Sequence, residues 1–145
     1  MHQNHRQFLL ELGCDKTKHS HRTLLDHLKG VHDLLRDWGN NEDVCNAGLF
    51  HSIYGTDTFK HVSLSDRSAL IDRIGAASEE LVRIFSEGKR PFFKNIDSNE
   101  TRLQLMEIEV ANLIDQHSGH KTLRKLLYTK ISDGAKAAIA MELSR

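Results

Sequence analysis

His51 is the first residue of this chain whose type and setting could carry chemistry. The largely apolar run Ala47–Phe50 precedes it, and Gly55 ends the pattern soon afterwards. A buried imidazole can bind a metal ion or move a proton, so the run indicates a metal or acid/base site. A core histidine whose hydrogen bonds are satisfied explains this segment equally well. Ser52 is a poor nucleophile for this base, because adjacent helical positions diverge by about 100 degrees.

Two more histidines, His21 and His27, fall on one predicted helix. Ser20 is a suitable N-cap for this helix, which runs to Trp38. His21 lies in the middle of its apolar stripe and His27 at the edge, so both imidazoles can point inward. The stripe consists of Leu24, Leu28, Val31, Leu35 and Trp38.

Asn112 and Asp115 share one face of a later predicted helix with Leu105 and Ile108. A second apolar stripe lies on the opposite face, which indicates a helix covered on both sides. Buried polar groups need partners, so Asn112 and Asp115 are candidate site residues. In the alternative interpretation, Asp115 lies beyond the covered part of the helix and contacts water.

The order and spacing of these residues resemble the HD superfamily of all-helical, metal-dependent phosphohydrolases. In that family a first histidine, a His-Asp pair ending the next helix and a distant aspartate bind a divalent metal. His27 lies 24 residues before His51, a spacing that the family commonly uses. Ile74–Val82 and Val110–Asp115 resemble two segments of the superfamily's hydrolases of guanosine tetraphosphate-type alarmones. The second of these segments carries the last metal ligand in those enzymes.

The resemblance covers about residues 20–118, but two of the family's aspartates are replaced. Ser52 stands in the place of the aspartate of the pair, and Asn112 in the place of the last aspartate. The family's Glu-Asp pair one turn later is shortened to Tyr54–Asp57. Two neutral oxygens in place of carboxylates remove most of the charge that holds a hard divalent ion. Leu49–Thr56 is also similar to the signature of an uncharacterised group of small HD-like domains.

The resemblance implies a rebuilt metal site in a small enzyme acting on a small polar, phosphorylated or nucleotide-like substrate. Two or three imidazoles with a carboxylate suit zinc, iron(II) or manganese. The implied ligands are His27, His51 and Asp115, with His21 and Asn112 as further ligands. The implied catalytic residues are His51 and Asp115, and the residues expected to contact substrate are Ser52, Tyr54 and Thr56. Asp57 is an alternative source of the carboxylate.

The competing hypothesis is a catalytically degenerate HD-like module without metal. Such a module would bind a small molecule or a protein partner in the same cavity.

Composition bounds the domain organisation and the partners. With 145 residues, the chain can bury one sizeable core but is too short for two ordinary domains. We expect one domain over residues 1–145, with a core at about 20–118 and helices at 120–143 packed on it. Twenty basic and twenty acidic residues give zero formal net charge, so no overall field favours nucleic acid or a membrane surface.

The two cysteines are far apart, and no apolar leader or bilayer-length run occurs. These features predict a cytoplasmic protein with reduced thiols. The basic stretches Lys89–Arg90 and Lys121–Lys130 are interpreted as solvated, although either could contact a phosphate.

Apolar stripes of helical period in every long segment, without strand-like alternation, predict an all-α fold of six to eight helices. The helices at 41–53 and 98–117 should be central. The other helices are expected at 3–12, 20–38, from Ser63 or Ser65 to 74, and at 76–85, 120–130 and 133–143.

Overall fold

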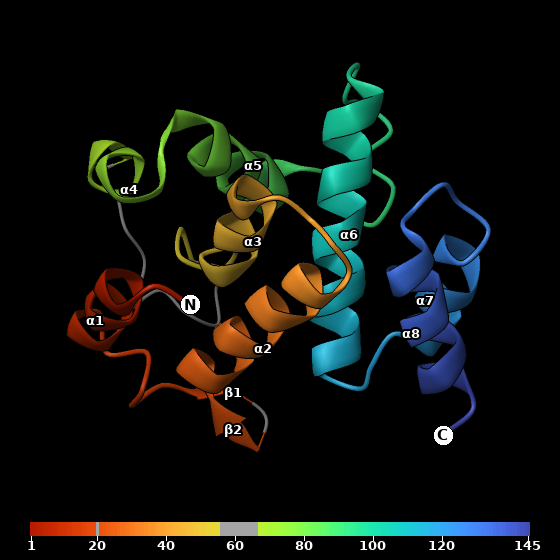
Figure 1. Ribbon diagram of the computed structural model, residues 1–145, viewed down its shortest axis with the longest axis horizontal. Helices are drawn as coiled ribbons and strands as arrows, with labels where there is room; N and C mark the ends of the chain where they lie inside the picture. Colours follow the sequence, from red (N-terminus) through yellow and green to blue (C-terminus); the bar gives the residue numbers. More distant parts are fainter. Residues whose placement is uncertain (20, 56–66) are drawn as a thin grey trace.

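The computed structural model describes residues 1–19, 21–55 and 67–145. Figure 1 shows α2, α3 and α6 at the centre, with α1 and α4 towards one end and α7 and α8 at the other. The prediction of an all-α fold is confirmed. The elements are α1 (Gln3–Glu11), β1 (Lys18–His19), β2 (Arg22–Thr23), α2 (Leu24–Asp37), α3 (Glu42–Leu49), α4 (Arg67–Ile74), α5 (Ala76–Glu87), α6 (Asn99–Asp115), α7 (His120–Leu126) and α8 (Asp133–Leu143).

Helix α2 begins later than the sequence predicts. Its N-cap is Thr23, whose hydroxyl accepts a hydrogen bond from the backbone N–H of Asp26 at 3.1 Å. Thr23 is therefore the N-cap in place of Ser20, the residue that the sequence predicts. Ser20 itself lies outside the described residues.

The residues before α2 form a short antiparallel ribbon in place of helix. Lys18 pairs with Thr23, and His19 pairs with Arg22. His21 lies in the turn of this ribbon and is exposed. The expectation that His21 belongs to the buried stripe of a helix is therefore wrong, because α2 starts only after the ribbon.

Helix α3 is shorter than predicted, and His51 lies beyond its end. The side chain of Asn41 caps the helix by accepting a hydrogen bond from the N–H of Val44 at 3.0 Å. The helix stops at Leu49, and Phe50 is its C-cap with a fully buried side chain. The predicted end at Ile53 is thus four residues too far, and His51 sits in a turn.

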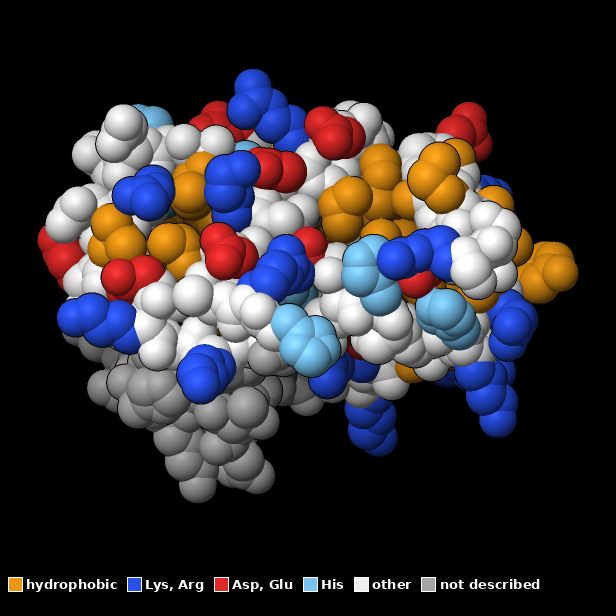
Figure 2. Space-filling model, turned by 90° about the horizontal axis from the view of Figure 1, so that it is seen from below, with side chains coloured by type: hydrophobic (Ala, Val, Ile, Leu, Met, Phe, Trp, Pro, Cys, Tyr) orange, Lys and Arg blue, Asp and Glu red, His pale blue; other side chains and the backbone are white. Residues whose placement is uncertain are grey.

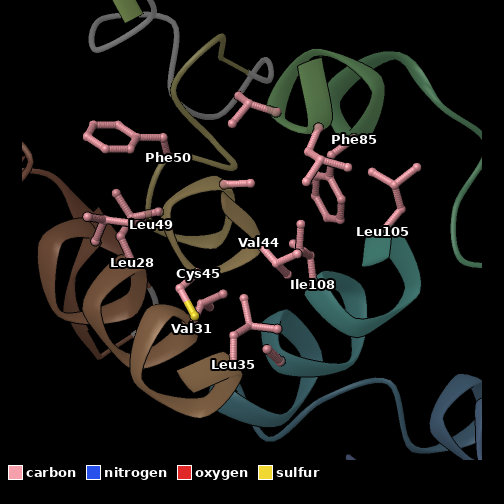
Figure 3. Close-up of a cluster of buried hydrophobic side chains, with 14 of the residues drawn as sticks. Leu28, Val31, Leu35, Val44, Cys45, Leu49, Phe50, Phe85, Leu105 and Ile108 are labelled. Atoms are coloured by element: carbon pink, nitrogen blue, oxygen red, sulfur yellow. The ribbon is translucent and has the colours of Figure 1, made fainter. Parts of the chain in front are cut away.

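The core lies where α2, α3, α5 and α6 meet (Figure 3). Gly48 allows α3 to approach α2 closely, since a Cβ there would lie 3.1 Å from Cγ1 of Val31 and closer still to Leu35. The labelled side chains of this core are Leu28, Val31, Leu35, Val44, Cys45, Leu49, Phe50, Phe85, Leu105 and Ile108.

A buried carboxylate, Glu107 of α6, joins three elements. It accepts hydrogen bonds from Nδ2 of Asn40 at 3.0 Å, the N–H of Ser132 at 2.9 Å and Oγ of Ser132 at 2.8 Å. Ser132 is also the N-cap of α8. The C-terminal helices are therefore tied to α6 and to the end of α2.

The remaining boundaries follow local signals in the sequence. Gly75, with a φ of 89°, separates α4 from α5, and Ser98 caps α6. Left-handed φ values of this kind favour glycine. Ser63 and Ser65, the predicted caps of α4, lie outside the described residues.

The molecular surface mixes charge of both signs. Figure 2 shows basic, acidic and histidine side chains interspersed on one face, with basic side chains frequent at the end that carries α7 and α8. Among the described residues, no helix has the length and apolar character needed to cross a membrane.

Candidate functional site

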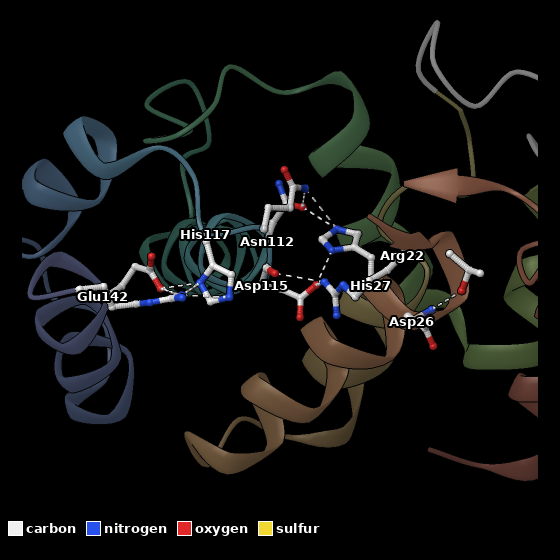
Figure 4. Close-up of polar contacts among 10 residues, drawn as sticks. Arg22, Asp26, His27, Asn112, Asp115, His117 and Glu142 are labelled. Carbon is white, nitrogen blue, oxygen red and sulfur yellow. Dashed lines mark hydrogen bonds and ion pairs between the residues drawn. The ribbon is translucent and has the colours of Figure 1, made fainter. Parts of the chain in front are cut away.

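The ring of His27 lies between two polar side chains of α6 (Figure 4). Its Nδ1 donates to Oδ2 of Asp115 at 2.6 Å, and its Nε2 lies 2.9 Å from Oδ1 of Asn112. His27 is fully buried, and Asn112 is 7% exposed. The structure therefore brings these three predicted residues into contact.

Asn112 belongs to a small network of polar side chains on α6. Nδ2 of Asn112 donates to Oε1 of Glu109 at 3.0 Å, and Nε2 of Gln116 donates to Oδ1 of Asn112 at 3.0 Å. Oδ1 of Asn112 is thus an acceptor, and so is the carboxylate of Asp115. Both nitrogens of His27 therefore face side-chain oxygens of α6.

Asp115 is held by two side chains, His27 and Arg22. Besides the His27 contact, NH2 of Arg22 pairs with Oδ2 of Asp115 and donates to its backbone carbonyl at 3.1 Å. Burial opposes ionisation of Asp115, but the hydrogen bonds from His27 and Arg22 outweigh it and keep the pKa of this carboxyl below its usual value. Asp115 is therefore fixed by its contacts with His27 and Arg22.

Gly30 of α2 makes room for the Asp115 side chain. A Cβ at Gly30 would lie 2.8 Å from Cγ of Asp115 and closer still to Oδ1. Atoms packed in a protein interior do not approach this closely. The contact between α2 and α6 thus depends on a residue without a side chain at this position.

His51 presents one free nitrogen to the site. Its Nδ1 donates to the carbonyl of Gly48 at 2.7 Å, so Nε2 carries the lone pair. Burial, and then the nearby His27, lower the pKa of His51 to about 3, which keeps the ring neutral. No described residue hydrogen-bonds Nε2. The ring stands edge-on to His27, with centroids 5.3 Å apart at 78°.

His19 is the site residue that sequence reasoning missed. Its ring stacks on His27 with centroids 4.2 Å apart. Burial, followed by His27, lowers the pKa of His19 to about 4. Helical periodicity selected His21, but the ribbon turns His19 towards the site and leaves His21 at the surface. The only signal in the sequence was the pair of neighbouring histidines in this loop, and it could not tell which of His19 and His21 faces the site.

His19 and His51 border a cavity of about 430 Å³. Glu109 is 5% exposed and lies 3.5 Å from Nε of Arg90 through Oε2. Burial raises the pKa of Glu109 against the opposing effects of Arg90 and Asn112. The main polar lining residues are His19, His51, Ser52, Arg90, Glu109 and Gln116.

The residues predicted to contact substrate lie in different surroundings. Ser52 lines the cavity, whereas the hydroxyl of Tyr54 bonds to Glu79, a carboxylate that is 1% exposed. Arg67 binds the same carboxylate through two hydrogen bonds, of 3.0 and 2.9 Å. Thr56 and Asp57, the remaining predicted residues of this segment, lie outside the described residues.

As they stand, the predicted metal ligands do not fit one ion. Asp115 and Asn112 contact opposite nitrogens of His27, which point away from each other, and Arg22 neutralises Asp115. His21 is exposed on the ribbon. Across the described residues, no three histidine, cysteine or acidic side chains are grouped so that they could hold a metal ion.

Comparison with known proteins gives one match. A family model described as "Domain of unknown function (DUF6817)" matches residues 8–90, more than half of the chain. It spans His19, His27 and His51 but ends before α6. No curated protein and no solved structure matches the chain. The match carries no link to the HD superfamily, so that resemblance stays a prediction.

Proposed function

The chain belongs to this family of domains of unknown function, and we propose that it is a metal-independent module binding a small polar molecule in the cavity beside His51. The supporting observation is the state of His51. Its Nδ1 is occupied by Gly48, and the remaining nitrogen, on a residue that lines the cavity, is an acceptor without a partner among the described residues. A ligand hydroxyl or N–H group would satisfy it.

The other polar groups of the lining complement this acceptor. Arg90 supplies a cation, and the amide of Gln116 and the hydroxyl of Ser52 supply further polar contacts. A few polar groups that converge on a concave site are typical of small-molecule binding.

Binding suits the site better than acid/base catalysis. A general base works best with a pKa near the working pH, and a pKa of about 3 makes His51 a weak base. Both ring nitrogens of His27 already have hydrogen-bond partners, and Asp115 is paired with Arg22 and bonded to His27. Of the two predicted catalytic residues, His51 is therefore too weak a base and Asp115 too tightly paired to transfer a proton.

The metal-dependent hydrolase remains the second candidate, favoured by one contact. A carboxylate that accepts from one nitrogen of a histidine is how proteins orient metal-bound imidazoles, and Asp115 accepts from Nδ1 of His27 in this way. This candidate requires His51 and Asn112 to join Nε2 of His27 in place of the present hydrogen bond. Elemental analysis of protein purified without a histidine tag should then find stoichiometric zinc, iron or manganese; metal-free protein that still binds ligand contradicts it.

Replacing His51 by phenylalanine is expected to abolish ligand binding in the His51 cavity while the fold persists. The ring of His51 packs edge-on against Phe85 and His27, and phenylalanine preserves this packing while it removes both nitrogens. Thermal unfolding should be measured with inorganic phosphate, ribose and ribose 5-phosphate. At least one should raise the Tm of the wild type but not of His51→Phe.

The matched control is His21→Gln, which changes an exposed histidine outside the cavity and should respond like the wild type. Two results would contradict the proposal. One is a wild-type Tm that none of the three compounds moves, and the other is a rise that is equal in the wild type and His51→Phe for every compound, ribose and ribose 5-phosphate included.

A further inference from the structure

A second hollow, of about 530 Å³, lies in the connection between α5 and α6. Every charged residue of its lining is a cation, and no carboxylate belongs to it. The lining consists of Lys89, Arg90, Phe92, Lys94 and Asn95. Three positive charges that converge on one hollow attract an anion with more than one negative charge.

Arg90 connects this hollow with the His51 cavity, because it lines both. Its guanidinium lies 5.2 Å from the ring centroid of Phe85, and Glu109 shares its charge at 3.5 Å. Lys89 and Lys94 have no ion-pair partner within the described parts of the chain. They therefore supply the uncompensated charge of the hollow, while Arg90 borders both spaces.

The backbone of this connection is held in place. The N–H of Phe93 donates to the carbonyl of Lys89 at 3.0 Å, and the Phe93 side chain is fully buried. The N–H of Ile96 donates to the carbonyl of Phe93 at 3.0 Å, and Arg102 of α6 donates to the carbonyl of Phe92 at 3.4 Å. A fixed backbone reduces the entropy lost when a ligand binds.

We propose that this hollow binds the phosphate group of a small molecule whose polar remainder enters the His51 cavity past Arg90. Phosphate carries up to two negative charges and several acceptor oxygens, which match two ammonium groups and one guanidinium better than a carboxylate does. Nζ of Lys94 lies 5.6 Å from the ring centroid of Phe92, so the aromatic ring borders the cationic group that meets the phosphate. The position of the organic part rests on the proposed function, whereas the phosphate contact does not.

The test is titration calorimetry with inorganic pyrophosphate on the intact chain, with acetate as the singly charged comparison. Lys89→Gln combined with Lys94→Gln should weaken pyrophosphate binding by roughly tenfold or more, because each charge-assisted contact contributes substantially to affinity. The matched control is Lys121→Gln with Lys125→Gln, which removes the same charge from α7 and should change affinity less than twofold. Binding of the wild type should also weaken as sodium chloride is raised.

Two results would overturn the phosphate site: wild-type protein that does not bind pyrophosphate, or equal losses in the two lysine pairs. The variant His51→Phe separates this proposal from the one before it. It should bind pyrophosphate like the wild type but lose the extra affinity for ribose 5-phosphate over inorganic phosphate. If it binds both like the wild type, the phosphate site stands and the His51 cavity is not a ligand site.

Discussion

Replacing Glu79 by alanine is expected to lower the free energy of unfolding by about 3 kcal/mol, because it removes the common acceptor of Tyr54 and Arg67. Glu79 is 1% exposed, so the tyrosine hydroxyl would be left in a partly buried setting without its partner. Urea unfolding measures this change. The control is Glu80→Ala, on the same helix with a side chain 62% exposed, which should change stability by less than about 0.5 kcal/mol.

The contribution of Glu79 should also depend on pH. The hydrogen bonds from Arg67 lower the pKa of this carboxyl below its usual value of 4.5, with burial opposing and Tyr54 assisting. A carboxyl with a lowered folded-state pKa stabilises the fold above its unfolded-state pKa and loses this effect as pH falls through the folded-state value. The stability gap between the wild type and Glu79→Ala should therefore be constant near neutral pH and shrink below about pH 4. A gap that widens with acid would contradict this role.

Gly30→Ala is expected to destabilise the protein by about 2 kcal/mol, although alanine favours helices over glycine by about 1 kcal/mol. The added Cβ would collide with the carboxyl of Asp115 and force it away from His27. Chemical denaturation gives the size of the change. Nuclear magnetic resonance of the His27 ring should show that the Nδ1 hydrogen bond is lost.

A double-mutant cycle tests the cause of this effect. In an Asp115→Ala background the obstructing carboxyl is absent, so Gly30→Ala should become stabilising by about 1 kcal/mol through helix propensity. If Gly30→Ala destabilises the wild type but stabilises the Asp115→Ala variant, the added Cβ collides with Asp115. If Gly30→Ala destabilises both backgrounds equally, Gly30 is needed for another reason.

The long helices could be predicted from the sequence because each has an apolar stripe and a capping residue. In the structure the caps are Asn41 for α3, Ser98 for α6 and Ser132 for α8. The end of α3 could not be predicted, because the residues after Leu49 are as apolar as those before it. Phe50 ends the helix, and its side chain fills the core. The position of this helix end therefore depends on how α2 and α5 pack.

The meeting of His27 with Asn112 and Asp115 followed from polar residues placed among apolar neighbours on two helices. Which nitrogen meets which residue did not follow from the sequence, and neither did the part played by Arg22. The ribbon that carries Arg22 and His19 has only two residues in each strand, too few for any periodicity to appear. The residues that helices contribute to the site could therefore be selected from the sequence, whereas Arg22 and His19 on the ribbon could not.

The family match ends at residue 90, yet much of what completes the core comes later in the chain. Leu105 and Ile108 of α6 fill the core against α3 and α5 (Figure 3), and both acceptors of the His27 ring belong to α6. A polypeptide cut after residue 90 would leave apolar faces in water and the His27 ring without its two hydrogen-bond partners. The cooperative folding unit is thus larger than the segment by which the family is recognised, and a truncation designed on that segment alone would remove half of the site.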